Sequence, residues 1–255
     1  MERIDFEISG EDSANWSIAD NIRTNGLDAN GGSLVATPKA RNSLHYFVSV
    51  PATLERDKKL KKFFKEYIIQ ADRTLTIPVG KTLEIEPGVT VRLGNESEIV
   101  VLGTLKAEGT EDKKITFTSL SGLWKNIRIM AGSAGSAISH AVFEYGGRYF
   151  NNMPLERRAM LSILENNAPV SNSIFKNSFS AGLKLALSDS LVEKNQFMTG
   201  TSTANTGMIA TGGAPKISDN VFANNYHGLW IESGSRASVE NNIFRDSVDY
   251  AIFSI

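Results

Sequence analysis

The sequence contains no cysteine, only three histidines and no long apolar run. Without cysteine, the chain can form neither disulfides, nor a thiolate nucleophile, nor a cysteine-based zinc site. The histidines form no HExxH motif and stand far apart, at His45, His140 and His227. No run of about 18 apolar residues occurs, so we expect no membrane span. Composition therefore argues against a disulfide scaffold, a zinc protease and a membrane protein.

Charges of both signs are balanced, with 27 Lys and Arg against 28 Asp and Glu among 255 residues. A balanced chain has no general basic field, so we expect no nucleic-acid partner. Hydrophobic residues make up 41% of the chain, which is enough for a core. The N-terminal MERIDFEISG lacks the basic and apolar regions of a secretory signal. If the natural protein is exported, we expect its signal to have been removed.

A six-residue frame occurs four times, as VSNSIF, VEKNQF, ISDNVF and VENNIF. Its phenylalanines follow one another at intervals of 22, 25 and 22 residues, at Phe175, Phe197, Phe222 and Phe244. An earlier ISHAVF places Phe143 in the same role, 32 residues before Phe175. The longer first interval is explained by GGRYFNNMPLERR, which has no strand alternation and is typical of an inserted loop. The chain is therefore a repeat protein over its C-terminal half.

A repeat of about 22 residues fits either a leucine-rich repeat or a parallel β-helix. A leucine-rich repeat needs a leucine ladder and a helical return, whereas these units carry short apolar alternations such as GLWIE and GLKLA between Asn, Gly and Ser. Asparagine suits a tight corner because it tolerates the left-handed backbone conformation, and stacked asparagines could share hydrogen bonds. The pattern predicts an all-β stacked β-helix with corners at the fourth frame position, which holds Ser173, Asn195, Asn220 and Asn242.

Three parts of the chain differ in composition and hydrophobic pattern. Residues 1–51 are polar and rich in turn residues, and no fold is assigned to them. Residues 52–66 read ATLERDKKLKKFFKE, and the spacing of Leu60, Phe63, Phe64 and Tyr67 among lysines predicts an amphipathic helix. We expect that helix to cap the open end of the solenoid, and a membrane-surface or partner-binding role is the alternative. Residues 67–255 form the predicted β-helix.

From Tyr67 onward the chain resembles a known family. LEIEPGVTVRLG, IVVLGTLKAEGTEDKKITFTS, LWKNIRI and FEYGG are similar to the opening coils of bacterial right-handed parallel β-helix proteins, and the N-x-F units to later coils. These proteins form the surface-protein branch of the pectin-lyase-like superfamily. The resemblance implies a right-handed single-stranded β-helix, and we expect about eight coils. It leaves the activity open, because the superfamily includes lyases, glycosidases, adhesins and phage tailspikes.

The repeat predicts which side chains of the third strand of each coil point outward. In GLWIE, Leu229 and Ile231 alternate inward, which leaves Trp230 and Glu232 outward. Aligning the coils predicts one outward column of Arg128, Ser162, Lys184, Ile209, Trp230 and Phe253. The neighbouring outward column reads Met130, Leu164, Ala186, Thr211, Glu232 and Ile255.

Candidates for catalysis are few. A retaining glycosidase needs two carboxylates about 5 Å apart, and Glu232 has no carboxylate on either neighbouring coil. Glu193 and Glu240 share a column but stand two coils apart, which is about 10 Å. Lyases of the resembled superfamily typically hold calcium with several acidic groups and use Arg or Lys as a base. Arg128 and Lys184 could serve as that base, and His227 is a weaker candidate. We expect no cofactor and no metal, because no acidic cluster is seen nearby; calcium is the alternative that the resemblance leaves open.

A binding site is better supported than a catalytic one. The connections into the third strands carry Tyr145, Tyr149, Tyr226 and His227, and Trp230 lies beside them. Aromatic faces near cationic and polar groups suit sugar rings. The alternative is that such aromatics, including Phe179 and Tyr250, fold inward to cover the sheet. The predicted ligand-binding residues are Trp230, Glu232, Tyr226, His227, Lys184, Arg128, Tyr145 and Tyr149.

The sequence thus predicts a non-catalytic, extracellular or cell-surface module that is adhesive or binds a polysaccharide or a cell-surface glycan. One alternative is a lyase or hydrolase acting on an acidic polysaccharide, and another is a rigid spacer of a larger surface protein. The closing YAIFSI stops in the middle of a coil by this alignment. We therefore also expect end-to-end self-association or further coils beyond residue 255.

Overall fold

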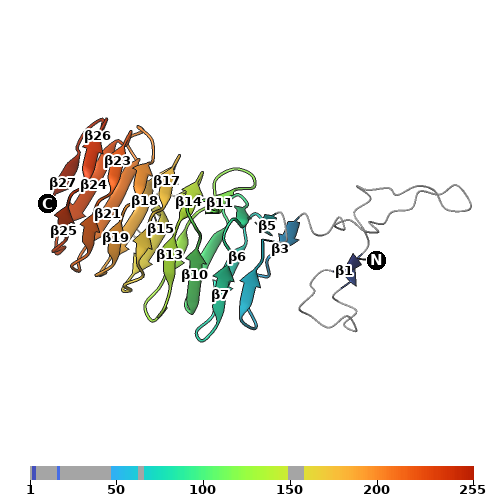
Figure 1. Ribbon diagram of the computed structural model, residues 1–255. Coiled ribbons are helices and arrows are strands. Elements are labelled where there is room, and N and C mark those ends of the chain that lie inside the picture. The colour runs from blue at the N-terminus through green and yellow to red at the C-terminus, as the bar shows by residue number, and fades with distance from the viewer. Residues whose placement is uncertain (1, 4–15, 18–46, 63–65, 149–157) are drawn as a thin grey trace, which may run out of the picture.

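A computed structural model describes residues 2–3, 16–17, 47–62, 66–148 and 158–255. Within these ranges the chain forms strands and turns, and no helix. Two short strands, β1 (Glu2–Arg3) and β2 (Trp16–Ser17), pair antiparallel. All other strands belong to three parallel sheets, whose coils stack from β3 and β5 to β25 and β27 (Figure 1). The predicted parallel β-helix is confirmed.

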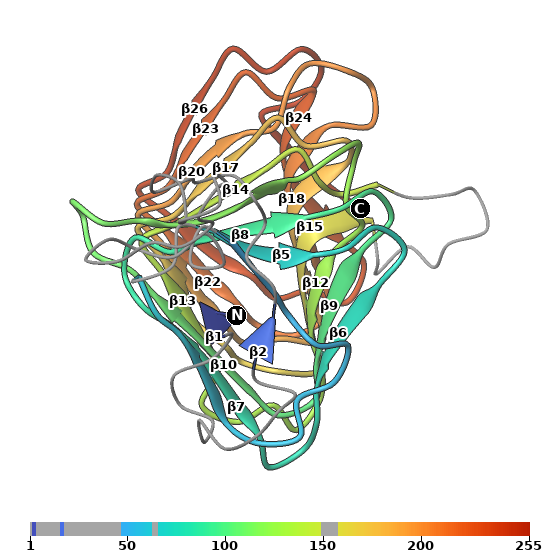
Figure 2. The ribbon, with the colours of Figure 1, turned by 90° about the vertical axis from the view of Figure 1, so that its right-hand side faces the viewer.

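The three sheets form the walls of the solenoid, and Figure 2 shows them around a roughly triangular outline. Sheet 1 contains β4 (Lys58–Leu60), β7 (Thr82–Ile85), β10 (Thr104–Glu108), β13 (Ala137–Ser139), β16 (Val170–Ser171), β19 (Leu191–Glu193), β22 (Lys216–Ser218) and β25 (Ser238–Glu240). Sheet 2 contains β3 (Phe47–Ser49), β5 (Glu66–Ile69), β8 (Thr90–Leu93), β11 (Ile115–Ser119), β14 (Ala141–Glu144), β17 (Ile174–Lys176), β20 (Gln196–Met198), β23 (Val221–Ala223) and β26 (Ile243–Arg245). Sheet 3 contains β6 (Thr74–Ile77), β9 (Glu98–Val101), β12 (Ile127–Ile129), β15 (Ala159–Leu164), β18 (Ala181–Ala186), β21 (Thr206–Thr211), β24 (His227–Glu232) and β27 (Ile252–Ser254).

Each coil passes through sheets 1, 2 and 3 in turn, so the eight strands of sheet 3 correspond to the predicted eight coils. The frame phenylalanines stack inside sheet 2 with ring centroids 4.7 to 5.0 Å apart. This separation matches the strand spacing, because each ring lies directly above the one in the preceding coil. The stack begins one coil earlier than the sequence predicts and consists of Phe117, Phe143, Phe175, Phe197, Phe222 and Phe244.

The asparagine ladder lies at the corner between sheets 1 and 2, as predicted. The Asn195 amide nitrogen donates to Asn220 Oδ1 at 3.0 Å, and the Asn220 amide donates to Asn242 Oδ1 at 2.9 Å. The same oxygens accept backbone N–H groups of the preceding coil. The left-handed conformation belongs to a different residue than expected. It occurs one position before the ladder, at Asn172, Lys194, Asp219 and Asn241, with φ between 51° and 57°.

The helix predicted for residues 52–66 is wrong for the described residues 52–62. Thr53 forms a parallel bridge with Thr76, and β4 pairs in parallel with β7. The alternation buries Leu60 and points Lys59 outward, where its ammonium meets Glu84 at 2.8 Å. That hydrogen bond raises the pKa of Lys59. Pairing with the free edge of β7 satisfies backbone groups that a separate helix would leave exposed at the sheet edge, so the segment continues the solenoid. Phe63 and Phe64 lie outside the described residues.

Candidate functional site

The outer face of sheet 3 carries the outward column predicted from the repeat. Strand pairing places Arg128 opposite Ser162, and Ser162 opposite Lys184. From Lys184 the column continues, one residue per coil, to Ile209, Trp230 and Phe253. The neighbouring column places Glu232 opposite Thr211, also as predicted. The alternate residue Leu229 is fully buried inside.

An open hollow of about 190 Å³ lies on this face at the start of three consecutive strands, β18, β21 and β24. Its floor follows the register of Ala181, Thr206 and His227, which are paired from coil to coil. The hollow is lined by Arg158, Ser180, Ala181, Thr203, Ala204, Thr206, Ile209, His227, Trp230 and Glu232. Three residues of the predicted site, Trp230, His227 and Glu232, thus meet at one surface feature.

A column of glycines lies at the start of these three strands. Gly182, Gly207 and Gly228 each follow one of the floor residues. A Cβ on Gly207 would lie 2.5 Å from the Gly228 carbonyl oxygen and 2.8 Å from a ring carbon of Phe222. The missing side chain therefore lets the backbone approach the phenylalanine stack closely. The residue before each glycine then faces the hollow.

Lys184 and Glu232 form an ion pair beside the hollow. Their side chains come from β18 and β24, two coils apart, with Nζ and Oε2 3.4 Å apart. The Thr211 hydroxyl from the intervening coil also donates to Glu232 Oε2. Lys184 is only 4% exposed, so its ammonium is compensated almost entirely within the protein. The pair holds the Glu232 carboxylate at the edge of the hollow.

His227 is the centre of an aromatic cluster on the last two coils. Its ring lies 4.7 Å from that of Tyr226 and 4.9 Å from that of Trp230, both edge-on, and stacks on Tyr250 at 5.8 Å. Phe253 contacts both Trp230 and Tyr250. Two buried nitrogens in the cluster, His227 Nδ1 and Trp230 Nε1, have no hydrogen-bond partner among the residues that the structure describes. The cluster is therefore tightly packed, and within the described part of the chain these two nitrogens make no hydrogen bond.

Asp249 completes this cluster and was missed in the sequence. Its Oδ2 lies 3.1 Å from His227 Nε2. An ionised carboxylate can only accept a hydrogen bond, so in this contact Nε2 is the donor when Asp249 is ionised. Asp249 lies in the connection between β26 and β27, and only its position one coil above His227 could have indicated the contact. That position depends on loop geometry that the repeat does not specify.

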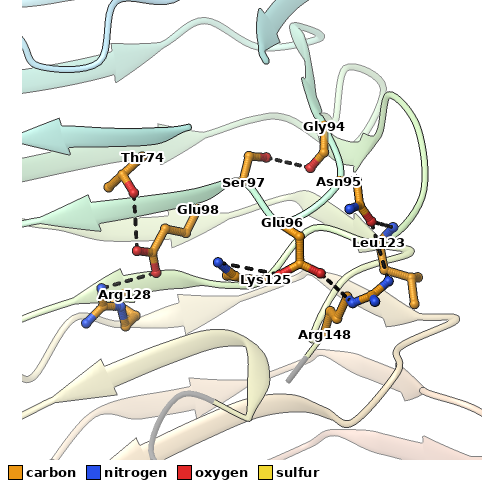
Figure 3. Close-up of polar contacts among 10 residues, drawn as sticks. All are labelled: Thr74, Gly94, Asn95, Glu96, Ser97, Glu98, Leu123, Lys125, Arg128 and Arg148. Atoms are coloured by element: carbon orange, nitrogen blue, oxygen red, sulfur yellow. Dashed lines mark hydrogen bonds and ion pairs between the residues drawn. The ribbon is translucent and has the colours of Figure 1, made fainter. Parts of the chain in front are cut away.

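Arg128 belongs to a separate group of ion pairs on the first coils of sheet 3 (Figure 3). Its Nη2 lies 3.1 Å from Glu98 Oε2, and Glu98 also accepts a hydrogen bond from Thr74. Arg128 and Lys184 are two coils apart in the column, which corresponds to about 10 Å. Arg128 does not line the hollow. The structure therefore separates the two candidate bases.

Glu96 gathers two further cations in the same region. Arg148 Nε lies 2.5 Å from Glu96 Oε1, and Lys125 Nζ lies 3.4 Å from Oε2 (Figure 3). Glu96 adopts a left-handed φ of 61° at the corner before β9. One carboxylate at this corner thus contacts both cations. The charges of Arg148 and Lys125 on these early coils are thus compensated by Glu96.

The predicted tyrosines are not all at the hollow. Tyr226 lies in the aromatic cluster, whereas Tyr145 follows β14, three coils earlier, which corresponds to about 14 Å. Tyr145 is 45% exposed. Tyr149 lies outside the described residues. Phe179 and Tyr250 are each 46% exposed, so neither is packed inside the solenoid.

The two acidic residues that share a column on sheet 1 lie two coils apart. Glu193 and Glu240 are both in register with Ser218 and lie on either side of it, as predicted. Among the described residues, no cluster of three or more His, Cys, Asp or Glu side chains could hold a metal ion. In the same part of the chain, no helix has the length and apolar character needed to span a membrane.

Comparison with known proteins identifies the fold. Residues 120–255, more than half of the chain, match a family described as "Right handed beta helix region". No curated protein and no solved structure matches the chain.

Proposed function

We propose that this chain, which belongs to the right-handed β-helix family, is a non-catalytic module that binds a glycan in the hollow on sheet 3. We propose further that it acts outside the cell or at the cell surface. The stacked coils supply a rigid scaffold, and the binding groups lie at strand starts and in the connections between strands. Function in rigid folds is commonly carried by such positions.

One observation carries the proposal: Trp230, His227 and Glu232 line a single open hollow, although the repeat requires none of these residue types there. Phe179 directly precedes the lining residue Ser180, and Tyr250 stacks on His227. Both are about half exposed. Exposed aromatic faces beside hydroxyl and carboxylate groups suit the apolar faces and the hydroxyls of a sugar ring.

The contacts of the cations support binding rather than elimination chemistry. A general base must lie within hydrogen-bond reach of the proton that it removes. Lys184 and Arg128 each form an ion pair with a carboxylate of the chain itself. Neither side chain lines the hollow, so neither is placed to reach a uronate bound there.

A glycan array followed by titration calorimetry tests the proposal. We expect at least one glycan to bind, and Trp230→Ala to weaken it by more than about 1 kcal/mol, or fivefold in Kd. Tyr145→Ala is the matched control, because it removes an exposed aromatic side chain that lies away from the hollow. We expect it to leave the Kd unchanged. Equal weakening by both variants would place the site elsewhere.

A parallel assay addresses the enzymatic alternative. Acidic polysaccharides are incubated with the full chain, and unsaturated products are followed by their ultraviolet absorbance. We expect no increase in absorbance. An increase that is lost in Lys184→Ala would instead identify a lyase.

A further inference from the structure

We infer that the hollow accepts neutral glycans and discriminates against uronate-containing ones. This inference rests on the proposed function and specifies its ligand class. It follows from the state of the cations around the hollow, since a site for a sugar carboxylate needs a cation whose charge is not already compensated.

The Lys184 ammonium is unavailable to a ligand carboxylate. Its side chain is 5% exposed, whereas that of its partner Glu232 is 26% exposed. A ligand at the hollow therefore meets the carboxylate before it meets the ammonium. To reach Nζ, a uronate would have to displace Glu232, which also holds the hydrogen bond from Thr211. A uronate that did not displace Glu232 would lie beside a like charge, which is repulsive in a partly buried site.

The other basic side chains near the hollow also interact within the chain. His227 faces Asp249, and the two rings of Tyr226 and Trp230 lie against its sides. Arg158 lines the hollow and already interacts within the chain. On the earlier coils, Arg128 is paired with Glu98. A uronate chain extended along sheet 3 would thus meet ion pairs that are already formed.

A neutral sugar does not have to displace Glu232, and it carries no charge that Glu232 would repel. The indole of Trp230 provides a flat apolar surface, and Thr203 and Thr206 line the same hollow with hydroxyl groups. Glu232 can accept hydrogen bonds from sugar hydroxyls, because a carboxylate has about four acceptor positions and Lys184 and Thr211 both donate to the same oxygen, Oε2. The same carboxylate that repels a uronate therefore binds a hydroxyl.

The test is an array of neutral and uronate-containing oligosaccharides of equal length, followed by titration of the best ligand of each class. We expect neutral ligands to bind at least tenfold more tightly, with a Kd that does not change with added NaCl, because no charge pair is formed. Tighter binding of uronates, weakened by salt, would overturn the inference and leave the proposed function intact. Binding of no glycan at all would overturn both.

The variant Glu232→Gln tests the cause of the discrimination. The amide keeps the size of the side chain and removes its charge, so the Lys184 ammonium loses its compensating carboxylate. We expect the affinity for uronate oligosaccharides to rise at least fivefold. Glu193→Gln is the matched control, because it makes the same change in net charge on sheet 1. An equal effect of both variants, or no gain in Glu232→Gln at an unchanged melting temperature, would contradict the inference.

Discussion

The inner and outer faces of the solenoid at β24 differ in how much the residue type varies from coil to coil. On the inside, Leu229 lies opposite Met208, and the phenylalanine stack beside them repeats the same residue in six coils. On the outside, one column changes from Arg128 through Lys184 to Trp230. An inner side chain must fit the same position of the next coil, so stacking restricts its type. An outer side chain has no such restriction, and this is where residues can serve a ligand.

The largest expected effect of a substitution is on the inside. Phe197 stacks between Phe175 and Phe222 at 4.9 and 4.8 Å and is fully buried. Phe197→Ala should lower the free energy of unfolding by about 3–5 kcal/mol, because it leaves a cavity in the stack. Urea unfolding followed by circular dichroism measures this loss. Phe179→Ala, on the outside, should cost under about 1 kcal/mol. Similar losses for both variants would remove the distinction between the two faces.

The asparagine ladder should show the next largest effect. Asn220 accepts from Asn195 and donates to Val192 O and Asn242 Oδ1, all at buried or half-buried positions. Asn220→Ala should cost about 2–3 kcal/mol, because buried partners lose their hydrogen bonds. Asn167 makes a comparable bond between coils, accepting from Asp189 N at 2.8 Å, but at an exposed position. Since water can replace that bond, Asn167→Ala should cost under about 1 kcal/mol, as measured by the same unfolding experiment.

The ion pair at the hollow should respond asymmetrically. Glu232→Ala leaves a nearly buried ammonium without its partner, whereas Lys184→Met leaves a carboxylate that water can reach. Glu232→Ala should therefore be the more destabilising of the two, by about 1 kcal/mol after allowing for partial exposure. Thermal unfolding of both variants checks the order. The reverse order would mean that Lys184 contributes mainly by its apolar packing.

Most of the fold could be predicted because the same residue types recur at nearly constant intervals along the sequence. The frame phenylalanines and asparagines identify the coils and their register, and hence the outward column. Phe117 was not recognised, because the six residues that end on it read DKKITF and lack the Val or Ile that opens every other frame. The helix prediction failed for a different reason. The spacing of Leu60 and Tyr67 fits a helix, but both side chains are buried by strands that continue the sheets.

The candidate site could be predicted only in part. Trp230 and Glu232 follow from strand alternation, which is a local property. The Lys184 to Glu232 ion pair crosses two coils, and the His227 to Asp249 contact depends on a loop, so neither follows from periodicity. The glycines at 182, 207 and 228 were the available signal. They recur at one position of three successive units and indicate a close approach of the backbone.

Titration of the full chain and of Trp230→Ala with the best glycan of the array tests the central claim most directly. Trp230 packs on His227 and Phe253, so we expect the substitution also to lower the free energy of unfolding, and the variant is titrated well below its melting temperature. Over the same comparison, the Kd should rise at least about fivefold. An unchanged Kd in a folded Trp230→Ala variant, or no binding by the unsubstituted chain to any glycan, would contradict the assignment of this face and favour a structural spacer.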